Sequence, residues 1–262
     1  MIELLKETAF QAGKIALADM ERLSIENIHN KSNVLDLVTD TDRKVEEFIV
    51  SRLKKHFPAY GIYGEETGKD HADSEYCFII DPIDGTASFT HKLPNWGISI
   101  GLTRNGQVIA GVIYQPVMDK LYYAERGKGS YCNGRKLACS NRARLCDAIA
   151  VTGFYCLREG WKEENNLRYF SRIAPHLCDI RKFGSAAVDC CKVAEGIIDF
   201  YWELCLQPYD MTAGAIIASE AGALVTDLHG GNNYPAMGLL ISNVPLQKEV
   251  LPFFTDFQAL HR

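Results

Sequence analysis

The chain has 262 residues, of which 47% are hydrophobic and 23% are charged. This composition is ordinary for a soluble globular protein, and the length fits one large domain or two tightly joined halves. The formal net charge is only −5 and no basic stripe stands out, which argues against nucleic acid as a partner.

Cysteine content and the N-terminus bear on the compartment. The chain has nine cysteines, an odd number, and no C-x-x-C spacing. This argues against a disulfide scaffold or a structural zinc site and predicts buried, reduced thiols. The N-terminus lacks the apolar centre of a signal peptide, and no apolar run approaches the roughly 18 residues that span a bilayer. We therefore expect a cytoplasmic protein with no membrane partner.

The N-terminal part of the chain predicts two amphipathic helices and then two strands. Thr41 or Asp42 is expected to cap the second helix. Two acids, Glu65 and Glu66, follow the first strand, and the second strand is a hydrophobic run that leads directly into Asp81. The predicted ranges are 3–23 and 42–56 for the helices, and 60–64 and 77–80 for the strands.

The run DPIDGT at 81–86 combines two carboxylates, a proline, a glycine and a hydroxyl. Pro82 fixes φ and is expected to end the strand. The resulting turn brings Asp81 and Asp84 to the same side, and Gly85 lets the backbone approach a ligand closely. Mg²⁺ prefers carboxylate oxygens as ligands, so the run indicates a metal site or, taken alone, an ordinary turn.

Residues 96–125 have the pattern of an antiparallel meander. Asn105-Gly106 is a strong hairpin signal between its first two strands. The glycines between 127 and 134 predict a further pair of tight turns. The three meander strands are expected at 96–104, 107–114 and 121–124.

After about residue 145, strands and helices alternate. This order predicts sheets and helices stacked in layers. We interpret 1–262 as a single domain, with an α+β half at about 1–145 and an α/β half at about 146–262. The predicted strands are 148–152, 179–183, 198–203, 223–226 and 239–242, and the predicted helices are 162–176, 185–195, 210–221 and 245–254.

Several acids stand at the ends of predicted elements: Asp42 at a helix start, Glu65 and Glu66 after a strand, and Asp210 before a helix. Sites in layered α/β proteins gather at such ends. Side chains alternate along an extended chain, so we expect one of Glu65 and Glu66 to face the site and the other to bond nearby. Each acid also has an ordinary explanation as a helix cap or a solvated surface group, and the spacing leaves both readings open.

The sequence strings themselves resemble the inositol monophosphatase family, part of the Mg²⁺-dependent, lithium-sensitive phosphatase superfamily. The likeness runs from Lys31 to about Asn243. It implies a five-layer αβαβα sandwich, a homodimer, and a hydrolase that attacks a phosphate monoester directly with metal-activated water. The matching strings are GEE (64–66), FIIDPIDGTASF (78–89), GKGSYCNGRKL (127–137), FGSAAVDCCKVAEGIIDFYWE (183–203) and YDMTAG…EAG (209–222).

The resemblance implies two or three Mg²⁺ ions. Glu65, Asp81 and the carbonyl of Ile83 match the ligands of a first ion. Asp81, Asp84 and Asp210 match those of a second ion, and a third, looser ion would also use Glu65.

The resemblance also implies catalytic and substrate-binding roles. Asp42 and Thr86, together with Glu65, match the residues that orient and deprotonate the attacking water. The backbone amides of Gly85 and Thr86 match a phosphate-binding site. The residues that match contacts to the substrate are Asp84, Gly85, Thr86, Ser185, Ala186 and Glu203, and Glu66 and Lys31 are further positions near the site.

The chain departs from the family pattern at five positions. Tyr209 stands in place of a tryptophan and Thr212 in place of an alanine. Ser88, Gln207 and Pro208 replace an asparagine, a histidine and a cysteine of the animal enzymes. Because all the metal-binding acids are present, these changes concern substrate specificity more than catalysis.

We therefore expect an enzyme that acts on a small-molecule phosphate ester, with myo-inositol monophosphate as the favoured substrate. Three other substrates remain open for the same chemistry: fructose 1,6-bisphosphate, histidinol phosphate and a nucleotide phosphate. A non-catalytic regulatory or binding protein on a phosphatase fold is the alternative of another class, against which the intact acids argue.

Overall fold

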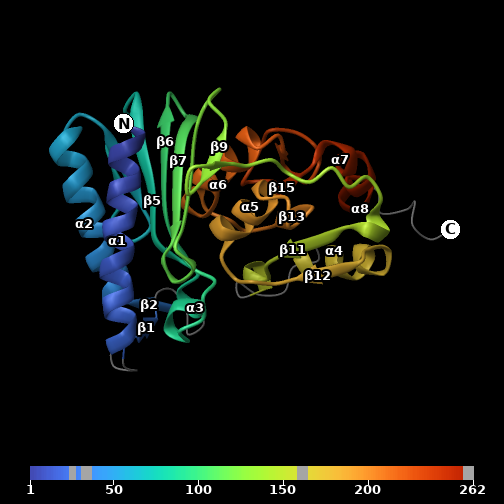
Figure 1. Ribbon diagram of the computed structural model, residues 1–262, viewed down its shortest axis with the longest axis horizontal. Coiled ribbons are helices and arrows are strands. Elements are labelled where there is room, and N and C mark those ends of the chain that lie inside the picture. Colours follow the sequence, from blue (N-terminus) through green and yellow to red (C-terminus); the bar gives the residue numbers. More distant parts are fainter. Residues whose placement is uncertain (24–27, 31–36, 158–164, 256–262) are drawn as a thin grey trace.

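Two β-sheets alternate with three layers of helices in the computed structural model, which describes residues 1–23, 28–30, 37–157 and 165–255 (Figure 1). Helices α1 (Ile2–Arg22) and α2 (Asp40–His56) cover the outer face of the first sheet. Helices α5 (Ala186–Ala194) and α6 (Pro208–Glu220) lie between the two sheets. The outer face of the second sheet is covered by α4 (Asn166–Ile173), α7 (Val244–Val250) and α8 (Pro252–Thr255). The predicted five-layer αβαβα sandwich is confirmed.

The first sheet has the strand order β10-β9-β8-β7-β6-β5-β3-β4. Its strands are antiparallel except for the parallel pair β3 and β5. Asn105 and Gly106 have φ angles of 49° and 75°, the left-handed pair that a tight hairpin requires, so the predicted hairpin is confirmed. The strands are β3 (Gly61–Gly64), β4 (Gly68–Asp70), β5 (Tyr76–Asp84), β6 (Gly97–Arg104), β7 (Gln107–Gln115), β8 (Lys120–Glu125), β9 (Ser130–Cys132) and β10 (Arg135–Lys136).

The second sheet has the order β12-β11-β13-β15-β14. Strand β11 runs parallel to both β12 and β13, and β15 runs antiparallel to its two neighbours. A separate pair, β1 (Ile28–Asn30) and β2 (Leu37–Thr39), precedes α2 and was not predicted. The strands of the second sheet are β11 (Ile149–Thr152), β12 (Asp179–Arg181), β13 (Phe200–Glu203), β14 (Leu224–Thr226) and β15 (Leu239–Ser242).

The layers are held together by three apolar clusters, one at each helical layer. The middle layer approaches the first sheet closely because Gly111 of β7 has no side chain. A Cβ at Gly111 would lie 2.8 Å from the Cα of Ala213 in α6. This contact fixes the position of α6 and therefore of the acid in its first turn, Asp210.

Two predicted boundaries near the acids are wrong. The strand does not end at Pro82: β5 continues to Asp84, which pairs with Gly97, and a register shift lies between Asp81 and Asp84. A bulge places the proline, which has no N–H, outside the regular ladder, so pairing resumes beyond it. Helix α2 begins at Asp40, with Thr39 and not Thr41 or Asp42 as its N-cap.

Other differences are small. Helix α6 begins two residues before the predicted start, so Asp210 lies within its first turn. The predicted helix at 162–176 is α4 followed by a 3₁₀ turn at Ala174–His176, where Pro175 prevents regular continuation, and its first residues fall outside the described chain. Within the described residues no helix has both the length and the apolar character needed to cross a bilayer.

Candidate active site

The bulge in β5 brings two carboxylates to the same place, and α6 adds a third. One carboxylate oxygen each from Asp81, Asp84 and Asp210 lie within 4.8 Å of one another. The Oδ1 atom of Asp81 accepts a 3.0 Å hydrogen bond from the backbone N–H of Ile83, which stabilises the bulge. In α6, Asp210 accepts a 2.6 Å hydrogen bond from the N–H of Gln207, as the third residue of a capping box.

The three acids face a cavity of about 290 Å³ between the ends of β5, α5, β13 and α6. Six of its seven charged lining residues are acids. Of the residues predicted for the site, Ile83, Gly85, Thr86 and Ala186 also line it. The charged lining residues are Glu65, Asp81, Asp84, Lys182, Asp189, Glu203 and Asp210.

Burial raises the pKa of each member of the three-carboxylate cluster. The pKa of Asp84 rises to about 6, although hydrogen bonds from Ser185 and Ala187 oppose the shift. Burial, then the charges of Glu65, Asp84 and Asp210, raise the pKa of Asp81, and burial with Asp84 raises that of Asp210. Concentrated negative charge away from water is unfavourable unless a cation compensates it. Closely spaced carboxylate oxygens therefore fit hard divalent cations such as Mg²⁺.

A tight turn follows the acids, and its residues Gly85, Thr86 and Ala87 line the cavity. Gly85 has a φ of 96° and precedes α3 (Thr86–Thr90). A Cβ at Gly85 would lie 2.9 Å from the carbonyl oxygen of Asn95 and 3.0 Å from that of Gly184, so only glycine fits. The first N–H groups of a helix have no partners within it, which suits them to an anion.

Asp42 is fully buried at the start of α2. Its Oδ2 atom accepts hydrogen bonds from the N–H and the hydroxyl of Thr39, at 2.8 and 2.6 Å. Its Oδ1 atom is buried and, within the described residues, has no hydrogen-bond partner. Burial raises the pKa of Asp42 to about 7, and the charges of Glu65 and Glu66 add to the shift. The hydroxyl of Thr86 donates to the carbonyl of Ile83 at 3.3 Å, so pairing of Asp42 with Thr86 stays a prediction.

The two glutamates after β3 differ in their surroundings. Glu65 lines the cavity, whereas Glu66 is not among the lining residues. Glu46 of α2, which sequence reasoning missed, is fully buried and accepts hydrogen bonds from the N–H groups of Glu66 (3.0 Å) and Thr67 (2.7 Å). An acid on the apolar stripe of the predicted helix was the signal for it.

Helix α5 and strand β13 form a further part of the cavity wall. Glu203 is buried there, and its Oε2 atom accepts a 2.8 Å hydrogen bond from the hydroxyl of Tyr201. Burial raises the pKa of Glu203 to about 7. Sequence reasoning missed the lining residues Asp189 and Lys182, although an acid within the small-residue run of α5 was a signal. Ser185 contacts Asp84 and is not a lining residue.

Four of the five departures from the family pattern, Gln207, Pro208, Tyr209 and Thr212, lie at the start of α6. Tyr209 lines the cavity and packs edge-on against Tyr63, with ring centroids 5.8 Å apart. The Thr212 hydroxyl donates a 2.6 Å hydrogen bond to the carbonyl of Pro208, so it is satisfied within the helix. Lys31 lies outside the described residues.

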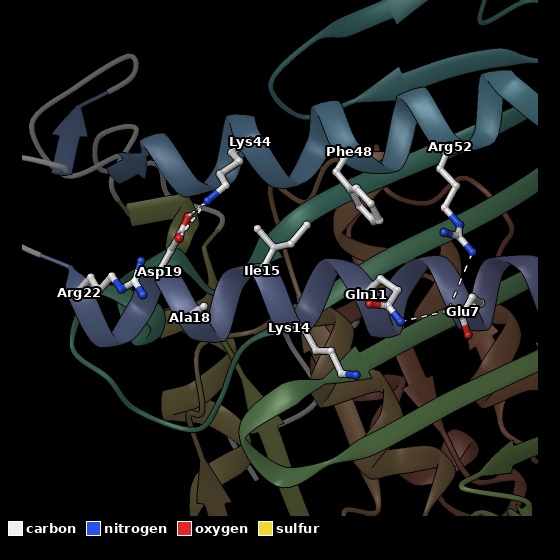
Figure 2. Close-up of a pocket in the computed structure, with 10 residues that line it drawn as sticks. All are labelled: Glu7, Gln11, Lys14, Ile15, Ala18, Asp19, Arg22, Lys44, Phe48 and Arg52. Carbon is white, nitrogen blue, oxygen red and sulfur yellow. Dashed lines mark hydrogen bonds and ion pairs between the residues drawn. The ribbon is translucent and has the colours of Figure 1, made fainter.

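A larger hollow of about 550 Å³ lies between α1 and α2 (Figure 2). Four of its six charged side chains form ion pairs with one another, Lys44 with Asp19 (2.8 Å) and Arg52 with Glu7 (3.9 Å). It opens widely to solvent on the outer face and holds no cluster of carboxylates, so it is not the candidate active site.

Comparison with known proteins agrees with the geometry. The sequence profile described as "Inositol monophosphatase family" matches residues 1–255. An inositol-1-monophosphatase from Mesorhizobium japonicum is 35% identical over 253 residues, covering 96% of this chain and 94% of that protein. The Nus factor SuhB of Pseudomonas aeruginosa is 34% identical over 247 residues, with coverages of 92% and 90%. The crystal structure of the extragenic suppressor protein suhB from Bartonella henselae has a TM-score of 0.89 at 33% identity, covering 97% of this chain and 98% of that one.

Proposed function

The chain belongs to the inositol monophosphatase family and is a phosphoric monoester hydrolase, and on that premise we propose that it hydrolyses myo-inositol monophosphate with Mg²⁺. The observation that carries the proposal is the cluster of Asp81, Asp84 and Asp210 at the cavity, with oxygens within 4.8 Å of one another. Glu203 of β13 lines the same cavity and offers an acceptor for hydroxyl groups. The site thus combines a place for metal and phosphate with a place for a polyol.

Five groups would hold two or three Mg²⁺ ions: the carboxylates of Glu65, Asp81, Asp84 and Asp210 and the carbonyl of Ile83. Bound Mg²⁺ supplies water of lowered pKa, neutralises the phosphate charge and stabilises the leaving oxygen. These ions also reconcile an acidic cavity with an anionic substrate, which the carboxylates alone would repel.

The protein's own groups would orient the reactants. The N–H groups of Gly85 and Thr86 would donate to the phosphate oxygens. The hydroxyl of Thr86 would hold the attacking water, and Oδ1 of Asp42, which is buried and has no described partner, would receive the proton through it. Water would attack phosphorus directly, without a phosphoenzyme, and Glu203 would accept a hydrogen bond from the departing polyol. A homodimer, inhibition by lithium and a cytoplasmic location belong to the same proposal.

The proposal is tested by phosphate release from a panel of esters, with Mg²⁺ or with EDTA. The panel contains myo-inositol 1-phosphate, fructose 1,6-bisphosphate, histidinol phosphate and a nucleoside monophosphate. We expect Mg²⁺-dependent release that is fastest with the inositol ester, and a loss of about 100-fold or more in kcat for Asp84→Asn. Asp147→Asn is the matched control, because Asp147 is about half exposed and pairs only with neighbours outside the cavity.

The outcomes separate the alternatives. If the inositol ester is not hydrolysed and another ester is, that ester replaces myo-inositol monophosphate as the proposed substrate. The proposed metal-dependent hydrolysis would be unchanged. Equal activity of Asp84→Asn and wild type would contradict the site. A regulatory protein is the second candidate, favoured by the name Nus factor of the Pseudomonas aeruginosa relative. Folded wild-type protein that releases no phosphate from any ester would support it.

A further inference from the structure

One buried carboxylate on the cavity wall has no part in the chemistry proposed above. Asp189, in the first turn of α5, is 2% exposed and lines the cavity. It is the one acid among the nine residues of this helix, whose other members are apolar apart from Lys192. A helix that packs between two sheets gains nothing in apolar burial from an aspartate, so the position of Asp189 calls for an explanation.

Asp189 is held in place by Lys192, one turn further along the helix. The Nζ atom of Lys192 lies 3.2 Å from Oδ1 of Asp189 and 4.3 Å from the ring centroid of Phe183. Lys192 is itself only 9% exposed. A buried ion pair often stabilises a fold no better than apolar residues of similar size. A pair of this kind at a ligand cavity is therefore better explained by binding than by stability.

The pair leaves one oxygen of Asp189 for a ligand. Within the described chain, the side chain of Asp189 has one hydrogen bond, which Nζ of Lys192 donates to Oδ1. The Oδ2 atom is not among the buried polar atoms that lack a partner, which agrees with contact between this atom and the cavity.

Asp189 interacts electrostatically with both Asp84 and Glu203. The charge of Asp84 raises the pKa of Asp189, and the charge of Asp189 raises the pKa of Glu203. Both Asp189 and Glu203 are fixed by a donor, Lys192 in one case and Tyr201 in the other. Two oriented acceptors that line one cavity match hydroxyl groups on the alcohol part of a substrate.

We propose that Asp189 is a specificity-determining residue that, together with Glu203, accepts hydrogen bonds from the hydroxyl groups of a polyol phosphate, and that Lys192 positions it. This proposal rests on the proposed phosphatase function and adds a residue that selects substrates rich in hydroxyl groups over simple esters. A site built to bond a hydroxyl discriminates strongly against an ester that lacks one, because its buried acceptor is then left without a partner.

The test compares two esters, myo-inositol 1-phosphate and phenyl phosphate, which carries no hydroxyl on its alcohol part. The variants are Asp189→Asn and Asp189→Ser, with Asp147→Asn as the matched control. We expect Asp189→Asn to raise KM for the inositol ester about tenfold while kcat changes less than about twofold. With phenyl phosphate, KM and kcat should both stay within about twofold of wild type. Thermal unfolding of each variant shows whether it is folded, and the serine variant takes its place if the asparagine variant is not.

Three results would overturn this inference. Equal losses on both esters would mean that Asp189 acts on the metal-binding carboxylates or on stability. An unchanged KM for the inositol ester would mean that Asp189 does not contact it. If wild type hydrolyses phenyl phosphate and not the inositol ester, a polyol phosphate is excluded as the substrate. The phosphatase function would still hold. Absence of Mg²⁺-dependent release from both esters by folded wild type would instead overturn the proposed function itself.

Discussion

The hydroxyl of Ser185 donates a 2.6 Å hydrogen bond to Oδ2 of Asp84, across the junction between the first sheet and the middle helical layer. The N–H of Ala187 donates to the same oxygen, also at 2.6 Å. Asp84 ends β5, whereas Ser185 is the N-cap of α5 and accepts from the N–H of Val188 at 3.3 Å. One carboxylate oxygen is therefore fixed by α5, and its partner Oδ1 remains available for a cation.

Replacing Ser185 by alanine should shift the activity of the enzyme to higher pH. Its hydrogen bond lowers the pKa of Asp84, which burial otherwise raises, to a balance at about 6. Without the bond, Asp84 holds its proton to a higher pH, and a protonated carboxyl binds Mg²⁺ poorly. We expect the acid limb of the pH–activity profile to move up and the Mg²⁺ concentration for half-maximal activity to rise. Profiles at several Mg²⁺ concentrations check this.

The serine has a second role as a helix cap, so Ser185→Ala should also cost about 1 kcal/mol of stability. Asn243→Ala is a suitable control for this part, because Asn243 caps α7 away from the cavity, accepting from the N–H of Leu246 at 2.8 Å. It should lower stability without moving the acid limb. A Ser185→Ala profile that coincides with wild type would contradict the role assigned to the Asp84 contact.

The metal-free protein should become less stable as pH rises from about 4 to about 7. Burial raises the pKa of Asp42 to about 7 and that of Asp84 to about 6. Between the unfolded values near 4 and these folded values, the native state binds more protons than the unfolded state, so the free energy of unfolding falls with pH. Thermal unfolding in EDTA across this range measures the fall.

Mg²⁺ should offset this loss, and more strongly at high pH, because it binds ionised carboxylates. A concentration of 100 times Kd would contribute about 2.7 kcal/mol. Asp84→Asn removes one titrating group and one proposed ligand, so both the pH slope and the Mg²⁺ effect should decrease. A melting temperature that Mg²⁺ raises equally at both ends of the range would be inconsistent with these buried acids as its ligands.

Replacing Gly85 by alanine should lower both stability and kcat. The residue has a φ of 96°, and its added Cβ would meet the backbone oxygens of Asn95 and Gly184 at 2.9 and 3.0 Å. Backbone atoms cannot move aside easily, so the turn that presents N–H groups to the phosphate must shift. We expect a loss of about 10-fold or more in kcat, measured with melting temperature on the same samples.

Gly106→Ala separates the two effects of that change. Gly106 has a φ of 75°, and a Cβ there would have nothing within 4 Å. This variant should lose about 1 kcal/mol through backbone strain and keep its activity. If Gly85→Ala were as active as Gly106→Ala, the amides after Asp84 would not bind the phosphate.

The sequence predicted the layers well because each element carries its own periodicity, as in the hairpin at Asn105-Gly106. The predictions were wrong where tertiary packing overrode a local sequence rule. Pro82 suggested the end of a strand, yet the bulge let β5 continue to Asp84. Asp189 was missed because the resemblance placed only Ser185 and Ala186 of this segment at the site, whereas the packing of α5 also brings Asp189 to the cavity wall.

The acids of the site were found by the motif and not by spacing. Asp81 and Asp84 are close in sequence, but Asp210 joins them only through the packing of α6 on the first sheet. The periodicity of a sequence predicts individual helices and strands, but it does not predict a contact between distant segments. Glu46 illustrates the same point, since its burial under the turn after β3 depends on how α2 docks.

Tyr201→Phe should weaken binding of the inositol ester at pH 7 and spare phenyl phosphate. The tyrosine hydroxyl donates to Oε2 of Glu203 at 2.8 Å and lowers the pKa of that carboxyl, which burial raises to about 7. Without the bond, the pKa rises further and more of Glu203 is protonated at pH 7, so a smaller fraction accepts hydrogen bonds as a carboxylate. We expect KM for the inositol ester to rise several-fold at pH 7 and to recover toward wild type at higher pH, because the carboxyl then ionises in both proteins. Tyr131→Phe, whose hydroxyl donates to the carbonyl of Lys128 on an exposed turn, is the control and should match wild type throughout. A KM that rises equally at every pH would show that the tyrosine acts on the shape of the cavity and not on the charge of Glu203.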